Sequence, residues 1–597
     1  MHGYCGKILR IDLEEKSYSA IPLEKRDAEQ FIGGTGIGIK IHYSMKSYEK
    51  DALSPSNPLV IMTGPISGLA PGTSRVAFCA KSPLTGIWGE SNSGGKMATY
   101  LKFAGWDGVI IEGRSKQPVY LVIERNCARF IDATGIWGKG CYEAQEIIER
   151  ELGEKRASTA VIGPAGENIV KFACIQVDNS RHAGRTGMGA VMGSKMLKGI
   201  AVVYDAKEKF QISLADEKGF KEVQEKFIEA INNDFACTMF KELGTSGYVE
   251  TAEGFGDLPT KYFTEGIFEG ASRISGSAMA SSILKGNDGC LGCIVRCGRI
   301  VEHKGRKIHG PEYETVAAFG SLQLNDNLEA IVELNYLLND LGMDTISAGV
   351  TIAFAMWMSE KGIGDFKVKW GDVERVKELI KDIAYRKGVG NELAEGVRFL
   401  ERKYNLEGYG AHVKGLEIPM HDARAFSSLA CAYAVHNRGA CHLPHQMYLY
   451  EMGKVIEEYG IVSPDRFANE GKGILTAKVQ NFSELFNAAT MCAFMPVTPK
   501  VLAEMLKFAT GFDFTVEKIA KVGERIFTLK RVYNLKCGIK AEDDVLPKIV
   551  LQPVKGGSEG RIPDVRRQVE EYYEYRNWPN GIPFKEKLKE LELDWVE

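Results

Sequence analysis

Three cysteines form one tight group in the chain: Cys290, Cys293 and Cys297. Thiolates at these spacings, in a loop that contains Gly292, can hold three irons of one cubane cluster, and a fourth ligand must then come from elsewhere. Structural zinc usually recruits a second Cys-x-x-Cys pair or a compact histidine pair, which this region lacks. The spacing therefore favours an iron–sulfur cluster over zinc or a group of unliganded thiols, and it cannot choose the fourth ligand among the lone cysteines.

Two glycine-rich segments with arginines have the composition of anion-binding loops. The first consists of Ser74-Arg75 and the downstream run Ser91-Asn92-Ser93-Gly94-Gly95-Lys96; the second runs Arg181-His182-Ala183-Gly184-Arg185-Thr186-Gly187-Met188-Gly189. Glycine lets backbone N–H groups approach a phosphate closely, and arginine adds forked donors that stay charged. Tight turns in a β-rich domain would need the same glycines, so either loop alone is explained equally well without a ligand. Neither loop matches the Rossmann fingerprint or the Walker A pattern, which disfavours a nucleotide-binding fold.

Candidate acid and base residues occur in two further segments. Glu312 and Glu314 follow the cysteines by about a dozen residues, and in an extended segment they would point to opposite sides, so that at most one faces a site. His442 and His445 lie close together farther along the chain. Each histidine alone is more often structural than catalytic.

The elements that must position these residues differ along the chain. Up to about residue 205, short apolar runs closed by glycine predict strands at 7–13, 59–62, 108–111, 119–123, 160–162 and 200–203. After residue 207 the apolar period becomes helical, most clearly over 328–341, where Gly342 ends the pattern. A second helix is predicted to follow Asp372, a plausible N-cap, and to continue towards Gly388.

Composition limits the possible functions. The chain has 597 residues, so we expect several domains and room to bury a large cofactor. Its net charge of −3 gives no basic footprint, and we expect no nucleic-acid partner. We find no signal peptide and no apolar stretch of membrane length, and most of the 13 cysteines are scattered. We therefore expect a cytoplasmic protein with reduced thiols and no membrane association.

The motifs, taken in order, resemble the aldehyde:ferredoxin oxidoreductase family over nearly the whole chain. The matching stretches are Gly64-Pro65, Lys81 to Gly86, Asn92 to Gly95, Leu101 to Gly105, Ile162 to Asn168, Ala183 to Arg185, Gly189 to Lys195, Cys290 to Cys297, Gly310 to Glu314 and Asn437 to Gly439. Such a collinear set is highly specific.

The resemblance implies an α+β fold in which a saddle of two β-sheets lies under two pterins and two mainly helical domains close over the metal. We expect a β-rich bis-pterin-binding domain over residues 1–207. A helical domain with the cysteine loop and Glu314 would then cover 208–415, and a helical domain with His442 would cover 416–597.

The resemblance also implies the cofactors: a tungsten (or molybdenum) bis-pyranopterin, a [4Fe-4S] cluster whose fourth ligand is Cys492, and Mg²⁺ between the pterin phosphates. Arg75 would lie between a pterin and the cluster. Asn92 and the backbone at His182 would help to hold the magnesium, between Arg181 and Arg185, and the glycines and Ala183 of both loops would line the pterins. Glu314 and His442 match the family's acid/base pair.

The chain departs from the family pattern at several positions. The family's Glu-x-x-His helix motif, which binds a dimer-bridging iron, reads Glu333 to Tyr336 here, and Lys377 appears in place of the distal ligand. A charged lysine cannot ligate iron. The two pterin-binding motifs begin with Asn339 and Asn487 instead of aspartate, and Asp340 and Asp344 follow the first.

The resemblance implies oxidation of an aldehyde to a carboxylic acid, with electrons passed to ferredoxin or a small iron–sulfur subunit. An alternative is the tungsten subunit of a larger low-potential reductase that acts on an aromatic acyl-CoA; such relatives are expected to replace the carboxylate that is Glu314 here. Two non-enzymatic alternatives are a metal-free electron-transfer subunit and a zinc-stabilised binding protein.

Overall fold

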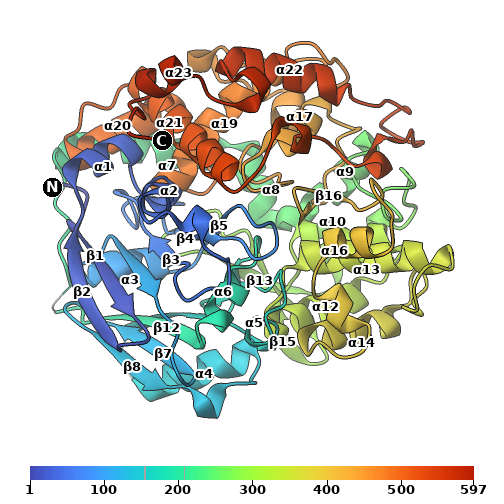
Figure 1. The fold of residues 1–597 in the computed structure, drawn as a ribbon, viewed down its shortest axis with the longest axis horizontal. Helices are drawn as coiled ribbons and strands as arrows, with labels where there is room; N and C mark the ends of the chain where they lie inside the picture. Colours follow the sequence, from blue (N-terminus) through green and yellow to red (C-terminus); the bar gives the residue numbers. More distant parts are fainter. Residues whose placement is uncertain (154–155, 208, 597) are drawn as a thin grey trace.

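The computed structural model describes residues 1–153, 156–207 and 209–596. Its N-terminal part contains two six-stranded sheets, each mostly antiparallel with one parallel pair (Figure 1). The first sheet has the order β2 (Ser17–Pro22), β1 (Lys7–Asp12), β6 (Gly108–Glu112), β3 (Leu59–Met62), β4 (Val76–Lys81), β5 (Trp88–Ser93). The second has the order β11 (Arg181–Ala183), β10 (Ile175–Val177), β9 (Arg156–Val161), β12 (Leu197–Tyr204), β7 (Val119–Ile123), β8 (Ala128–Asp132).

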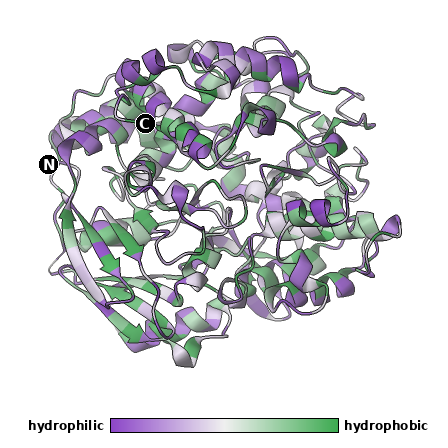
Figure 2. Cartoon of the chain, in the orientation of Figure 1, coloured by the Kyte–Doolittle hydropathy of each residue, from purple (hydrophilic) through white to green (hydrophobic). Residues whose placement is uncertain are grey.

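The two sheets share one apolar core. Leu9, Ile11 and Phe78 of the first sheet are fully or almost fully buried in the same cluster as Leu121 and Val202 of the second. Successive strand residues point to opposite faces, so each of these strands contributes alternate side chains to the core. Figure 2 shows the strands largely green, that is hydrophobic, whereas the outer helices near the C-terminus are largely purple.

Six helices accompany the sheets: α1 (Lys25–Phe31), α2 (Gly34–Ser44), α3 (Met97–Phe103), α4 (Cys141–Leu152), α5 (Pro164–Glu167) and α6 (Met188–Ser194). The middle part of the chain is mainly helical. Its helices are α7 (Glu217–Asn233), α8 (Phe235–Leu243), α9 (Val249–Phe255), α10 (Gly276–Ser282), α11 (Tyr313–Phe319), α12 (Leu328–Leu341), α13 (Thr345–Glu360), α14 (Val373–Ala384), α15 (Gly390–Leu393) and α16 (Val397–Lys403). The α+β class expected from the sequence is therefore confirmed.

Helix α12 begins and ends as its sequence predicts, and α14 begins as predicted but ends at Ala384, before Gly388. In α12 the Asn327 side chain accepts from the Ala330 amide, and Gly342 ends the helix with a φ of 78°. That left-handed conformation is readily available to glycine. In α14 the side chain of Asp372 accepts from the amide of Arg375, as expected for an N-cap.

A small three-stranded sheet interrupts the helical middle part. Its strands are β13 (Leu284–Asp288), β14 (Gly298–His303) and β15 (Arg306–His309). The cysteine group lies in the loop between β13 and β14. A second hairpin pairs β16 (His412–Val413) with β17 (Leu416–Glu417), and Gly415, at the domain boundary predicted from the sequence, lies in its turn.

The C-terminal helices return to cover the N-terminal part. They are α17 (Ser427–Val435), α18 (Met447–Glu451), α19 (Lys472–Ala489), α20 (Pro499–Thr510), α21 (Val516–Lys536), α22 (Val565–Arg576) and α23 (Lys585–Glu590). Helix α2 packs against α19 and α21, so the two ends of the chain are joined in one core. Among the described helices, none is long and apolar enough to cross a membrane.

Candidate active site

Four cysteines from two distant segments line one small cavity. Cys290, Cys293 and Cys297 come from the β13–β14 loop, and Cys492 follows the C-terminal end of α19. Arg75 and Phe494 line the same cavity. The fourth cysteine implied by the family resemblance is thus the one that the fold brings to the other three.

The first glycine-rich loop makes room for this cysteine loop. A Cβ added to Gly94 would lie only 2.5 Å from the sulfur of Cys290. The amide of Leu291 donates to the carbonyl of Gly95 over 3.1 Å, and the Ser74 hydroxyl donates to the Leu291 carbonyl over 2.7 Å. Gly94 therefore leaves room for the sulfur of Cys290, a reason that sequence inspection alone did not supply.

Two arginines lie beside the cysteine loop. Arg75 donates to the carbonyl of Asn92 over 2.8 Å. Arg181 places Nη2 3.1 Å from the carboxylate of Asp288, and a Cβ on Gly94 would meet its Cδ at 3.5 Å. Both cations lie where they can offset the negative charge of ligating thiolates.

Asn92 and Asn487 meet between the N-terminal sheet and α19. The amide of Asn92 donates to Oδ1 of Asn487 over 3.1 Å, while Oδ1 of Asn92 is buried without a hydrogen-bond partner in the described chain. A Cβ added to Gly184 in the second loop would meet no atom within 4 Å, leaving open space there. His182 Nε2 lies 3.3 Å from the side-chain amide of Gln176. An unsatisfied acceptor and an open glycine loop are features of a ligand cradle.

Arg185 directs its guanidinium at protein groups. It donates to the carbonyls of Ala440 (2.8 Å) and Glu417 (2.5 Å), and its Nε lies 3.4 Å from the carboxylate of Asp344. The same Asp344 carboxylate caps α13 and accepts from the Ser347 hydroxyl. The predicted phosphate contact of Arg185 stays a prediction, since in this arrangement its donors join three parts of the chain.

Asn339 lies in the last turn of α12. Its side-chain amide donates to Oδ1 of Asn335 over 3.3 Å, and its carbonyl accepts from Gln176 over 3.4 Å. The neighbouring Asp340 accepts from the Tyr142 amide. Pterin contacts of Asn339, Asp344 and Asn487 stay predictions.

Glu314 lies in the first turn of α11, and not in an extended segment as the sequence suggested. Its Oε2 accepts from the Met420 amide over 2.8 Å, whereas its buried Oε1 has no hydrogen-bond partner among the described residues. Glu312 turns away and accepts from the Thr245 hydroxyl. Glu312, the extended N-cap residue of α11, and Glu314, in its first turn, thus have different partners, and the role of Glu314 at the site stays a prediction.

Two histidines face the open oxygen of Glu314. Nε2 of His442 lies 3.2 Å from Oε1, as the expected pairing requires, and Nε2 of His421 lies 3.5 Å from it. Single ligand atoms of the three side chains all lie within 4.8 Å of one another. Sequence reasoning missed His421, because an isolated histidine after a two-residue strand carries no pattern.

Burial and neighbouring charges shift the pKa values of Glu314, His442 and His421. Burial raises the pKa of Glu314, and the nearby His421 and the Met420 amide oppose that rise. Burial, together with the charge of His421, holds the pKa of His442 well below its usual range, which leaves a neutral imidazole. For His421, burial acts downward, but Asp257 and Glu314 outweigh it and raise the pKa.

The surface at the expected iron-bridging position is occupied by ion pairs. Glu333 lies 2.9 Å from both Lys377 and Lys304, and these cations hold its pKa far below the usual range. Tyr336 stacks on Tyr142 at a ring distance of 5.0 Å. The carboxylate of Glu333 is already fully engaged in this chain.

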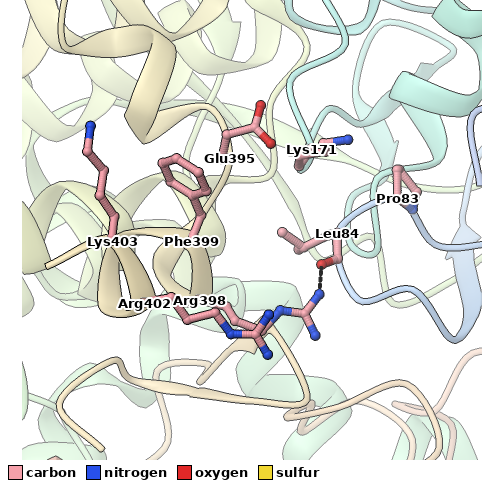
Figure 3. A pocket seen from close by; sticks show the side chains of 8 residues that line it. All are labelled: Pro83, Leu84, Lys171, Glu395, Arg398, Phe399, Arg402 and Lys403. Atoms are coloured by element: carbon pink, nitrogen blue, oxygen red, sulfur yellow. Dashed lines mark hydrogen bonds between the residues drawn. The ribbon is translucent and has the colours of Figure 1, made fainter. Parts of the chain in front are cut away.

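A separate cavity of about 470 Å³ lies between α16 and the N-terminal part (Figure 3). It is lined by Pro83, Leu84, Lys171, Glu395, Arg398, Phe399, Arg402 and Lys403, and Arg398 donates to the carbonyl of Leu84 over 2.6 Å. None of the candidate site residues lines it.

Comparison with known proteins matches nearly the whole chain. A family model described as the N-terminal domain of aldehyde ferredoxin oxidoreductase matches residues 8–204, and one for domains 2 and 3 matches residues 222–593. The chain is 36% identical to a tungsten-containing aldehyde ferredoxin oxidoreductase of Thermococcus kodakarensis, with 99% of each chain covered. It is 37% identical to the protein of that name in Pyrococcus abyssi, with 100% of each covered.

One solved structure extends the comparison of the fold. It is titled as the active site complex BamBC of benzoyl coenzyme A reductase, and it superimposes with a TM-score of 0.84 over 100% of this chain and 98% of its own. Sequence identity to it is 22%, so this likeness concerns the fold alone.

Proposed function

The chain belongs to the aldehyde ferredoxin oxidoreductase family, a family of oxidoreductase enzymes, and we propose that it oxidises an aldehyde to a carboxylic acid with the help of tungsten. The observation that carries this proposal is the buried group of Glu314 and His442, in which Oε1 of Glu314 and Nδ1 of His442 lack hydrogen-bond partners in the described chain. A buried polar atom without a partner needs an explanation, and a bound ligand is one that fits a carboxylate and an imidazole that lie 3.2 Å apart.

The residues present fit a tungsten bis-pterin between the sheets and the helical parts. The open space at Gly184, the free acceptor of Asn92 and the nearby Asn487 supply polar contacts for a large, phosphorylated ligand. Asn92 and the backbone at His182 would help to hold a Mg²⁺, which would offset the phosphate charge. When bound, such a centre supplies two-electron redox chemistry.

The four-cysteine cavity supports the proposal of one [4Fe-4S] cluster. Four thiolates around one small cavity are the usual ligand set of a cubane, and Arg75 and Arg181 offset its negative charge. Such a cluster passes electrons one at a time. We propose that ferredoxin or a small iron–sulfur subunit receives them.

The side chains perform the proton chemistry of the reaction. Oxidation of an aldehyde with water yields a carboxylic acid, two protons and two electrons. Oε1 of Glu314 is free to accept a proton from water or from the aldehyde hydrate, because only Oε2 is held by the backbone. His442, with a neutral imidazole, can donate a hydrogen bond to the carbonyl oxygen.

The test is metal analysis of anaerobically purified protein, together with viologen reduction by a panel of aldehydes. We expect tungsten and about four irons per chain, and dye reduction with at least one aldehyde that Glu314→Gln slows by roughly two to four orders of magnitude. The panel should include an aromatic acyl-CoA and an aliphatic sulfonate, because one 30% identical relative is named a subunit of an aliphatic sulfonate oxidoreductase. Turnover of one of these, with no aldehyde turned over, would contradict the proposal.

A further inference from the structure

His421 is a fully buried imidazole between two carboxylates. Its Nδ1 lies 2.6 Å from Oδ2 of Asp257, and its Nε2 points at Glu314 from the opposite side of the ring. The side chain of His421 is 2% exposed and that of Asp257 is not exposed at all. A buried carboxylate is stable only when it is paired, and here the imidazole is its ionic partner.

Aromatic rings and backbone contacts fix the orientation of this imidazole. The ring of Tyr448 stacks on it at 4.2 Å with an interplanar angle of 9°, and the ring of Tyr313 lies 5.0 Å away. The Tyr433 hydroxyl donates to the carbonyl of His421 over 3.0 Å. The Tyr313 hydroxyl donates to the carbonyl of Met420, whose amide binds Glu314. The imidazole therefore cannot turn away from Glu314 without moving this packing.

The other ionisable neighbours leave the His421 ring as the imidazole that carries positive charge beside Oε1 of Glu314. The four tyrosines around it, Tyr248, Tyr313, Tyr433 and Tyr448, stay neutral because burial raises each pKa. Three further charged groups lie near this pair and Glu314: Arg185, Asp344 and Asp422. Arg185 is paired with Asp344, and Asp422 is paired with Arg424. His442 is neutral, so among the described residues His421 is the charge-bearing imidazole beside Glu314.

We propose that Asp257 and His421 form a positioning pair for Glu314, in which the charged imidazole keeps that carboxylate ionised and fixes the direction of its Oε1. This inference rests on the proposed role of Glu314 as the base. Asp257 contributes the negative charge that keeps His421 protonated, and the Tyr248 hydroxyl, 3.1 Å from Oδ2, holds Asp257 in place. Neither Asp257 nor His421 needs to touch substrate.

Asp257→Asn is the variant that tests the charge. An asparagine oxygen still accepts from Nδ1 of His421 but no longer stabilises the positive ring. A neutral ring turns a lone pair towards Glu314, and the carboxyl then protonates more readily. An opposite charge at this distance is worth about 1 to 3 pH units, so the acid limb of the kcat profile should move up by about that amount. Activity should return at high pH, with tungsten and iron contents unchanged.

Infrared titration of the holoenzyme gives a readout that does not depend on turnover. In Asp257→Asn at neutral pH we expect a C=O stretch of a protonated carboxylic acid that the parent lacks. The double variant with Glu314→Gln should lose this band, which assigns it to Glu314. If no tested compound is turned over, this titration still decides the inference, so its failure and that of the proposed function can be told apart.

Tyr248→Phe is the matched control, because it removes the other bond to Asp257 and leaves every charge in place. Its acid limb should stay within about half a pH unit of the parent. If Asp257→Asn fails to fold, His421→Gln removes the same positive charge and should shift the limb in the same direction. If the acid limb of the kcat profile of Asp257→Asn does not move and the infrared band does not appear, the proposed positioning pair is wrong. An equal loss of activity at every pH would also overturn it, as would a further stoichiometric metal ion that His421→Gln releases.

Discussion

At the scale of single residues, Glu314 uses its two oxygens differently. Oε2 is held by the backbone at Met420, and Oε1 faces two imidazoles without a hydrogen bond in the described chain. Because only Oε1 is free, the geometry leaves one oxygen to exchange a proton with substrate.

Glu314→Gln should keep tungsten bound and slow turnover by roughly two to four orders of magnitude, the usual contribution of a general base. The amide is nearly isosteric and cannot accept the proton. Steady-state kinetics with matched metal analysis measures this. Turnover within a few-fold of the parent would make Glu314 structural and would move attention to His442.

Cys492→Ser should lower the iron content well below about four per chain and slow electron transfer to viologen. Serine removes the thiolate that the fold places in the cavity of the other three cysteines. Cys431→Ser is a suitable control, since that buried thiol lies in a different core cluster. Unchanged iron and activity in Cys492→Ser would remove this residue from the ligand set.

From the sequence, candidate site residues that belong to a local pattern were easier to predict than those whose partners are distant in the chain. The three clustered cysteines could be proposed from spacing and the loop that contains Asn92 from its glycines, whereas Cys492 and Asn487 were proposed only from the family resemblance. His421 could not be identified, because its partners Asp257 and Glu314 are more than a hundred residues away and only tertiary contacts join them.

At the scale of elements, α12 was predicted with the correct bounds from its apolar period and Gly342, and α14 with the correct start from its N-cap Asp372. Strands β3 and β7 have the predicted bounds because both are apolar runs. Strand β5 was missed, since its sequence Trp-Gly-Glu-Ser-Asn-Ser is mostly polar and is held by pairing with β4. That missed strand carries Asn92.

The contact between Gly94, the residue that follows β5, and the cysteine loop gives a test at this scale. Gly94→Ala should displace that loop, because a Cβ there would lie 2.5 Å from the Cys290 sulfur, and iron content should fall. Gly286→Ala in β13 is the control, since no atom lies within 4 Å of its added Cβ. Equal iron in both variants, measured on purified protein, would show that the loop can shift freely.

At the scale of the whole molecule, the ion pairs of Glu333 with Lys377 and Lys304 predict that no iron bridges two copies of this chain. An iron there would have to displace two ammonium groups and would find Tyr336 in place of a histidine. Anomalous scattering at the iron edge, combined with the oligomeric state in solution, measures this. A metal ion located between the Glu333 side chains of two copies would contradict the prediction.

The guanidinium of Arg185 has a consequence for how the protein matures. Its donors reach Asp344, Glu417 and Ala440, so this clasp closes only after the middle and C-terminal parts have docked on the N-terminal sheets. If the proposed cofactor is seated between these parts, it can enter only before docking is complete or while these contacts are open. After docking, the rate at which these Arg185 contacts open limits the rate of cofactor loss. The time for which the protein keeps its cofactor then depends on this opening rate and not on the binding affinity.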